Sequence, residues 1–240
     1  MGGIVINSIE HEVQRRRITR LCHFTPSRNL VHILTGTTGI LATKHLQEDE
    51  RSIFTQTDLE RLDGHQKYIC CSIEYPNAWY FDKAKSKDIL FKDWVILFIN
   101  PRYLWLTGTR FCPRNAASSY GRNIREGEQA FLAMFSDAVP GAYGKTRCRS
   151  SNHLDCCPTD DQAEVLIPDA IPIEDILAIA VPTETQAKNE AVRLQILGIS
   201  EDKYKLVVAP DLFDKTKLSQ LIRSGNRPPE TPWTPPRDEI

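Results

Sequence analysis

The chain has 240 residues, of which 41% are hydrophobic and 25% are charged, and its formal net charge at pH 7 is −1. This composition is ordinary for a soluble globular protein, and no run approaches the 18 apolar residues of a membrane-spanning helix. The first 17 residues lack the apolar core and cleavage site of a secretion signal, and the odd number of seven cysteines favours reduced thiols. We therefore expect a cytoplasmic protein without a membrane partner.

The first half of the chain predicts alternating short strands and helices. In order, we expect a polar lead-in with solvated arginines at 10–17, a strand at 18–25, a short helix at 29–36, a weak helical segment at 57–62, and strands at 68–75 and 93–101. The run at 93–101 is apolar throughout, which favours a strand that is buried on both faces.

The second half predicts long loops between a few regular elements. We expect loops at 102–125 and 141–161, a helix at 126–139, strands at 164–168, 176–181 and 205–209, a helix at 184–197 and a last helix capped by Asp211. About six short strands with scattered helices indicate an α+β fold. We expect one domain over residues 1–225, followed by an extended, flexible, proline-rich tail at 226–240.

Positive charge is concentrated in one region. Residues 101–150 contain eight Lys and Arg residues but only three acidic residues, although the whole chain is nearly neutral. This asymmetry is compatible with a polyanion that binds there, and equally with a basic surface loop that has no partner.

Glu164 is the candidate for chemistry because it stands immediately before the apolar residues of a predicted strand. A rigid element would hold this carboxylate at the edge of a cleft. Gln162 lies two residues earlier and would face the same way on an extended segment. A solvated strand end with two polar residues is the alternative.

Several short motifs follow one another in an order that resembles the DarT family. These are His23-Phe24-Thr25, then Asn29, then the segment SIEYPN at 72–77, and finally Gln162-Ala163-Glu164 before an apolar strand. DarT enzymes are DNA ADP-ribosyltransferases of bacterial toxin–antitoxin pairs, within the ADP-ribosyltransferase superfamily. The resemblance implies a single domain with a central mixed or antiparallel split sheet, flanking helices and long substrate loops. It also implies NAD as co-substrate, single-stranded DNA as substrate and a macrodomain antitoxin as partner.

The resemblance gives each candidate residue a role. Glu164 would stabilise the positively charged ribose that forms when NAD loses nicotinamide, and would take the proton from the attacking base. Arg61 would hold NAD and assist the reaction, with Arg51 as a rival. The other expected contacts to NAD are His23, Thr25, Asn29, Ser72 and Tyr80. Each could instead be structural, for example as a core histidine, a helix cap or a small strand residue.

The basic region would then bind the substrate. A base cannot be modified inside a stacked duplex without extrusion, which makes single-stranded DNA the easier substrate. The residues expected to contact its phosphates are Lys145, Arg147, Arg149, Arg114 and Arg122.

Three alternatives remain open on the sequence. Cys148, His153, Cys156 and Cys157 could bind zinc, although we expect no metal because the spacing lacks a CxxC pair. Other carboxylates are available at Glu74, Glu126 and Glu128. Finally, the enzyme could modify RNA or protein, or the chain could be a nucleic-acid-binding domain without catalytic activity.

Overall fold

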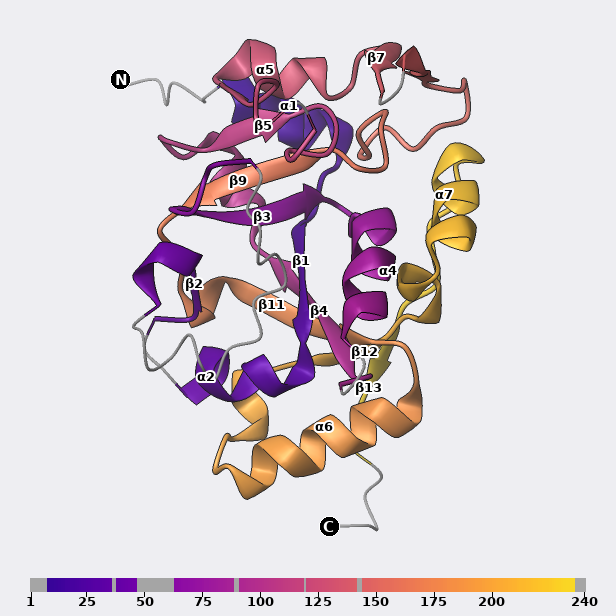
Figure 1. The fold of residues 1–240 in the computed structure, drawn as a ribbon. Coiled ribbons are helices and arrows are strands. Elements are labelled where there is room, and N and C mark those ends of the chain that lie inside the picture. The colour runs from indigo at the N-terminus through magenta and orange to yellow at the C-terminus, as the bar shows by residue number, and fades with distance from the viewer. Residues whose placement is uncertain are drawn as a thin grey trace, which may run out of the picture.

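A computed structural model describes residues 8–35, 38–46, 63–88, 91–118, 120–141 and 144–235. Within these ranges nine strands form one sheet in the order β13-β12-β11-β4-β1-β3-β9-β5-β6 (Figure 1). The strands are β1 (Leu21–Pro26), β3 (Tyr68–Ile73), β4 (Trp94–Ile99), β5 (Arg110–Cys112), β6 (Arg125–Glu126), β9 (Glu164–Pro168), β11 (Ile176–Val181), β12 (Leu206–Val208) and β13 (Thr231–Trp233). β11 and β12 run parallel and the other neighbours run antiparallel, so the predicted mixed α+β sheet is confirmed.

Helices and two small ribbons surround this sheet. The ribbons pair β2 (Ile40–Leu41) with β10 (Ala170–Ile171) and β7 (Ala138–Pro140) with β8 (Thr146–Cys148). The α-helices are α1 (Ser8–Arg16), α2 (Leu30–Thr35), α4 (Ala78–Lys87), α5 (Glu128–Ala133), α6 (Glu184–Ile196) and α7 (Lys215–Arg223). Figure 1 shows α1 and α5 at one end of the molecule and α6 at the other.

The sheet is split between β1 and β3. β1 pairs with β4 along all six of its residues, but with β3 only through Leu21–Ile73 and Cys22–Ser72. The remainder of β3 pairs with β9 instead, and in Figure 1 these two strands run across the direction of β1 and β4. β1 therefore separates from β3 from His23 onward, and the candidate site lies in this opening.

β4 forms the centre of the core. Each of its six residues is at most 4% exposed, which confirms the expectation from the apolar run at 93–101. A strand buried on both faces gives its neighbour β1 a rigid support. The strands predicted at 164–168 and 176–181 coincide with β9 and β11, and the helix predicted at 184–197 coincides with α6 to within one residue.

The N-terminal segment corrects the first prediction. Residues 8–16 form helix α1 rather than a polar lead-in. Ile9 and Val13, four residues apart on one face, are buried, and the guanidinium of Arg16 lies 4.1 Å from the ring centre of Phe135. Two apolar residues among many charged ones give too weak a helical period for the sequence to predict this helix.

The middle of the chain holds more structure than its composition predicts. The helix expected at 126–139 is only α5, because the chain turns at Met134 and Phe135 and continues into strand β7. The predicted loop at 102–125 contains β5, and the predicted loop at 141–161 contains β8. Strands of three residues are too short to show a period, and they form because an existing strand edge accepts them.

The C-terminal prediction needs two corrections. The cap of the last helix is Asp214, whose carboxylate accepts from the backbone N–H groups of Thr216 and Lys217, and not Asp211. The segment from Asn226 is extended as expected, but it is docked on the domain where the structure describes it. β13 pairs with β12 at the sheet edge. Side-chain hydrogen bonds also join Arg227 to Glu74 and Glu230 to Arg20.

Candidate active site

The carboxylate of Glu164 is fixed by three N–H donors. Glu164 is the first residue of β9 and is 7% exposed. Its Oε1 accepts from Nδ2 of Asn77 at 2.9 Å and from Nδ2 of Asn115 at 3.2 Å. Its Oε2 accepts from the backbone N–H of Ala116 at 3.0 Å. Such an arrangement favours one orientation of the carboxylate, as a group with an electrostatic role requires.

Asn77 connects Glu164 to the rest of the fold. It caps α4, because its Oδ1 accepts from the backbone N–H of Tyr80 at 3.0 Å. Its own backbone N–H donates to Oγ of Ser72 at 3.1 Å. Ser72, which we expected to contact NAD, thus also holds the residue that holds Glu164.

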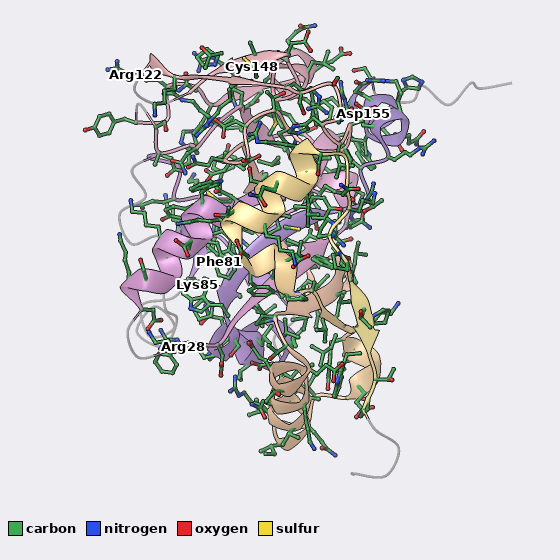
Figure 2. The ribbon with its side chains drawn as sticks, turned by 90° about the vertical axis from the view of Figure 1, so that its right-hand side faces the viewer. Arg28, Phe81, Lys85, Arg122, Cys148 and Asp155 are labelled. Atoms are coloured by element: carbon green, nitrogen blue, oxygen red, sulfur yellow. The ribbon has the colours of Figure 1, made fainter. Side chains whose placement is uncertain are left out.

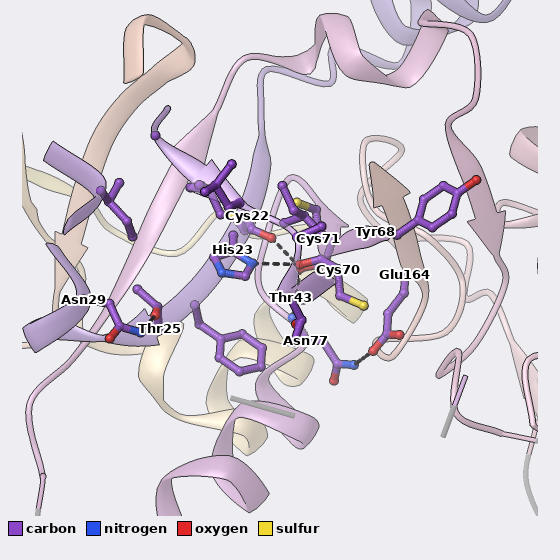
Figure 3. A pocket seen from close by; sticks show the side chains of 18 of the residues that line it. Cys22, His23, Thr25, Asn29, Thr43, Tyr68, Cys70, Cys71, Asn77 and Glu164 are labelled. Atoms are coloured by element: carbon purple, nitrogen blue, oxygen red, sulfur yellow. Dashed lines mark hydrogen bonds between the residues drawn. The ribbon is translucent and has the colours of Figure 1, made fainter. Parts of the chain in front are cut away.

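A cavity of about 350 Å³ lies in the opening between β1 and β3. Glu164 and Asn77 are at one side of it, and His23, Thr25 and Asn29 are at the other (Figure 3). Ser72 and Tyr80 line it as well, so the structure gathers all the described residues that the sequence assigned to NAD. Its apolar wall comes from Ile33, Ile40, Leu41, Ala42, Leu46 and Ile69.

His23 bridges the two halves of the split sheet. Its Nδ1 lies 2.8 Å from the carbonyl oxygen of Cys70 on β3. A carbonyl can only accept, so Nδ1 carries the proton in this contact. The ring is thereby held in the cavity wall at the point where β1 leaves β3.

Thr25 and Asn29 form a pair on the wall beyond His23. Nδ2 of Asn29 donates to Oγ1 of Thr25 at 2.8 Å, and both residues are at most 5% exposed. They line the cavity from the end of β1 and from the 3₁₀ turn Ser27–Asn29. Their assignment to NAD stays a prediction.

Some expected site residues are not in this cavity. Arg61, its rival Arg51 and the helical segment at 57–62 lie outside the described residues. Gln162 is half-buried and does not line the cavity. The chain is still turning there, with the backbone N–H of Gln162 donating to Asp160, so the alternation of an extended strand does not apply before Glu164.

The competing carboxylates have other partners. Glu74 is fully buried and accepts from Thr19 and Arg227 away from the cavity. Glu126 is exposed and pairs with Arg110, and Glu128 is exposed on α5. Among the described residues, Asp63 is the other carboxylate that lines the cavity, and the sequence analysis missed it.

The five basic residues fall into two groups. The guanidinium of Arg149 donates to the carbonyls of Cys157 and Leu154, both at 2.8 Å, and Arg114 donates to the carbonyls of Pro140 and Gly141. These contacts tie loops together and favour a structural role for both arginines. The other group is exposed and consists of Arg122, Lys145 and Arg147. Figure 2 shows Arg122 at the same end of the molecule as Cys148, where the β7–β8 hairpin lies.

The possible zinc ligands do not converge. Within the described part of the chain, no three His, Cys, Asp or Glu side chains are arranged to hold a metal ion. Cys148 is exposed, whereas His153 is buried with Nε2 3.0 Å from the carbonyl of Pro158. Cys156 and Cys157 are buried with their sulfur atoms 3.8 Å apart.

Thiols near the site are poor nucleophiles. Burial raises the pKa of Cys22 to about 12 and that of Cys112 to about 11. Burial likewise raises the pKa of Cys71 well above its ordinary value. These side chains remain neutral at physiological pH and serve as small apolar groups in the core.

Sequence analysis missed three groups that hold Glu164, namely Asn77, Asn115 and the backbone N–H of Ala116. Asn77 belongs to the SIEYPN motif but has no role assigned to it from the sequence, and Asn115 lies within the predicted loop at 102–125. The position of Asn77, directly after proline and before the helical segment AWYF, was the one usable signal, since asparagine there favours a cap.

Comparison with known proteins gives one family. The family model described as "ssDNA thymidine ADP-ribosyltransferase, DarT" matches residues 22–214. No curated protein sequence matches this one. No helix in the described ranges combines the length and the apolar character that crossing a membrane would need.

Three solved structures are similar in fold. Thermosipho africanus DarTG in complex with ADP-ribose is 13% identical with a TM-score of 0.54, and the match covers 81% of this chain and 51% of that one. Thermus sp. 2.9 DarT in complex with ADP-ribosylated ssDNA is 16% identical with a TM-score of 0.50, over 78% of this chain and 97% of that one. The same Thermus protein in complex with NAD+ is 18% identical with a TM-score of 0.49, over the same shares of the two chains.

Proposed function

The chain belongs to the DarT family of ssDNA thymidine ADP-ribosyltransferases, and from this premise we propose that Glu164 is its catalytic carboxylate. The enzyme transfers ADP-ribose from NAD to a thymidine base of single-stranded DNA. The observation that carries the proposal for Glu164 is its geometry. It is a buried carboxylate, held by three N–H donors, at the wall of the cavity in the split sheet.

The reaction explains why such a group is needed. The bond between nicotinamide and the ribose C1′ breaks, nicotinamide leaves with the electron pair, and positive charge develops on the ribose. A fixed carboxylate in a site that excludes water stabilises this charge far more than an exposed one would. The base nitrogen that forms the new bond must lose its proton, and Glu164 is the acceptor that we assign to it.

The cavity suits the nicotinamide end of NAD. Its volume of about 350 Å³ is in the range of ligand pockets in proteins. We assign His23 and Tyr80 to direct contact with NAD, with Thr25 and Asn29 beside them, and Ser72 to the support of Asn77. For the pyrophosphate we retain Arg61, with Arg51 as the alternative, because a cation is needed there.

The exposed basic residues suit the DNA strand. Arg122, Lys145 and Arg147 are exposed, so each can contact a phosphate. Arg114 and Arg149 are already bound to backbone carbonyls. We therefore assign phosphate binding to the first three alone.

We propose a macrodomain antitoxin as partner and the cytoplasm as location. The partner follows from the family's place in toxin–antitoxin pairs, and this chain spans about half of the Thermosipho DarTG chain. The location follows from the substrates, because both NAD and single-stranded DNA are available there. Co-expression of a macrodomain that removes ADP-ribose from DNA should restore growth to cells that produce this protein.

The decisive experiment measures the intact mass of short oligonucleotides after incubation with NAD. We expect a gain of one ADP-ribose on thymidine-containing single-stranded DNA with the unchanged protein. Glu164→Ala should reduce the rate by at least about 10²–10³-fold, the loss typical of a group that stabilises developing charge. Glu128→Gln, an exposed carboxylate change, is the matched control and should leave the rate unchanged.

Each other outcome points to a different function. Modification of RNA or of protein instead of DNA would change the substrate class while keeping the site. Salt-dependent DNA binding, with neither NAD consumption nor an effect of Glu164→Ala, would indicate a binding domain without catalysis. Full activity of Glu164→Ala would refute the assignment of Glu164.

A further inference from the structure

Tyr120 is the most exposed aromatic side chain in the part of the chain that the structure describes. It is 77% exposed, against 42% for Phe91 and 40% for Trp79. The guanidinium of Arg28 lies 3.8 Å from the ring centre of Phe91, and the ammonium of Lys215 lies 5.3 Å from that of Trp79. Among the residues that the structure describes, no aromatic ring or cation covers Tyr120 in this way.

The backbone holds Tyr120 in a strained conformation. Its φ is +55°, a left-handed value that costs a bulky residue of this kind free energy. The next residue, Gly121, also has positive φ and lies so close to Asp63 that a Cβ atom there would be 2.5 Å from its carbonyl oxygen. The turn is therefore packed against the backbone of Asp63, which restricts any change of its conformation that would relieve the strain at Tyr120.

This turn lies at the rim of the candidate active site. The backbone N–H of Tyr120 donates to the carbonyl of Ala117 at 3.2 Å. Ala117 lines the cavity, and so does Asp63, which contacts Gly121 on the other side. The turn that carries Tyr120 and Gly121 is thus held between two wall residues of the cavity that contains Glu164.

Exposed basic residues stand in the same loop as Tyr120 and in the hairpin joined to that loop. Arg122 is exposed two residues later, and the hairpin with Lys145 and Arg147 is joined to the same loop by the hydrogen bonds of Arg114 to Pro140 and Gly141. An exposed aromatic ring on the same surface loops as exposed cations is the combination that binds single-stranded nucleic acid, because the ring stacks on a base and the cations contact phosphates.

We propose that Tyr120 stacks on a base that flanks the modified thymidine in single-stranded DNA. This inference rests on the function proposed above and adds a residue that contacts the substrate outside the cavity. The target base enters the cavity, and the adjacent base, no longer stacked on it, meets the ring at the rim. Tyr120 would then set the register of the strand without reading its sequence, since every base has an aromatic face.

The test compares DNA binding by three variants. Dissociation constants are measured by fluorescence anisotropy with a labelled oligonucleotide that contains one thymidine, and with matched oligonucleotides that lack one flanking base. Tyr120→Ala should weaken binding of the intact oligonucleotide by about 5- to 150-fold. Tyr120→Phe keeps the ring and should bind as the unchanged protein does. Phe91→Ala is the matched control, because Phe91 lies beside Arg28, which Figure 2 shows far from Arg122.

The oligonucleotides without a flanking base identify the contact. The unchanged protein should bind one of them weakly, and Tyr120→Ala should cause no further loss with that one. An equal loss on every oligonucleotide, or no loss on the intact one, would overturn the proposal. The rise in melting temperature caused by NAD should be the same in all variants, and a smaller rise in Tyr120→Ala would indicate a structural role instead.

The same experiment separates the two proposals. If the unchanged protein modifies DNA but Tyr120→Ala binds it equally well, only the role of Tyr120 fails. If the unchanged protein neither binds nor modifies any oligonucleotide, the proposed function fails and the role of Tyr120 fails with it.

Discussion

The side chain of Asn77 links the carboxylate of Glu164 to the start of helix α4. Nδ2 donates to Oε1 of Glu164 at 2.9 Å, while Oδ1 caps the helix through the backbone N–H of Tyr80. The backbone N–H of Asn77 is held in turn by Oγ of Ser72 on β3. Asn77 therefore ties the candidate catalytic carboxylate on β9 to the start of α4 and to β3.

Shortening Asn77 should separate its two roles. Serine is as good a cap as asparagine, but its hydroxyl cannot also reach Glu164. In Asn77→Ser we expect the melting temperature to stay nearly constant while kcat falls by about 10- to 100-fold, because Glu164 loses its orientation. Asn77→Asp keeps the cap but sets a carboxylate against that of Glu164, and should be less active still.

Steady-state kinetics and thermal unfolding measure these effects. Asp214→Ser is the control, because it makes a similar change at the cap of α7, away from the cavity. A wild-type kcat in Asn77→Ser would show that Asn115 and Ala116 suffice to orient Glu164.

Two neighbouring arginines should behave in opposite ways. Arg147 is exposed, whereas the guanidinium of Arg149 donates to the carbonyls of Cys157 and Leu154. Arg147→Ala should weaken DNA binding and reduce the slope of log affinity against log salt by about 0.7, with no change in stability. Arg149→Ala should instead lower the melting temperature, because two part-buried carbonyls lose their donor. Salt titrations of DNA binding and thermal unfolding of both variants test this difference between the two arginines. Equal effects of the two substitutions on the salt slope would contradict the prediction.

What the sequence predicts well is local in the chain. The apolar runs bounded by proline or polar residues locate β4, β9 and β11, and the position of Glu164 before such a run makes it the candidate carboxylate. The hydrogen-bond partners of Glu164 cannot be predicted in this local way. Asn77 and Asn115 lie 87 and 49 residues away in the sequence, and only the pairing of strands brings them to it.

The errors have the same origin. α1 and β13 are elements whose own residues give little signal, and they form because the rest of the domain offers an apolar surface or a free strand edge. Arg149 shows that residue type alone does not separate a phosphate-binding arginine from one that satisfies carbonyls. Tertiary contacts decide such cases, and a single sequence does not contain them.

Arg227 lies in the C-terminal segment, and its removal should lower the stability of the whole domain. Its guanidinium donates to Oε1 of Glu74 at 2.7 Å, and Glu74 is fully buried while Arg227 is about half exposed. Among the described residues, Arg227→Ala leaves the Glu74 carboxylate with its bonds to Thr19 alone, and it should cost about 1–3 kcal/mol of unfolding free energy.

The comparison that isolates this pair is a double-mutant cycle. In the background of Glu74→Gln, Arg227→Ala should cost less, because no buried charge is left without a partner. Arg15→Ala, at an exposed ion pair on α1, should cost at most about 0.5 kcal/mol. Equal costs of Arg227→Ala in both backgrounds would show that its contact with Glu74 does not stabilise the fold.

Stability should fall as the pH is lowered through the titration of His153. Burial lowers the pKa of His153 from 6.5 to about 4 in the folded protein, and Arg149 adds to the shift. Below pH 6.5 the unfolded chain binds a proton that the folded chain does not bind until about pH 4. The stabilising contribution of neutral His153 is therefore complete above pH 6.5 and is lost progressively between pH 6.5 and 4.

His153→Gln shows how much of the pH dependence belongs to this residue. Glutamine can still donate to the carbonyl of Pro158 but does not titrate, so it removes the proton and keeps the contact. Burial raises the pKa of Asp160 and Glu190, so their protonation favours the folded protein as the pH falls, which is opposite to the effect of His153. The difference in unfolding free energy between the unchanged protein and His153→Gln removes this shared contribution. Urea unfolding at several pH values should show the advantage of the unchanged protein over His153→Gln shrinking by about 2–3 kcal/mol as the pH falls from 7 to 4. A difference that does not change with pH would mean that His153 titrates alike in the folded and unfolded chains.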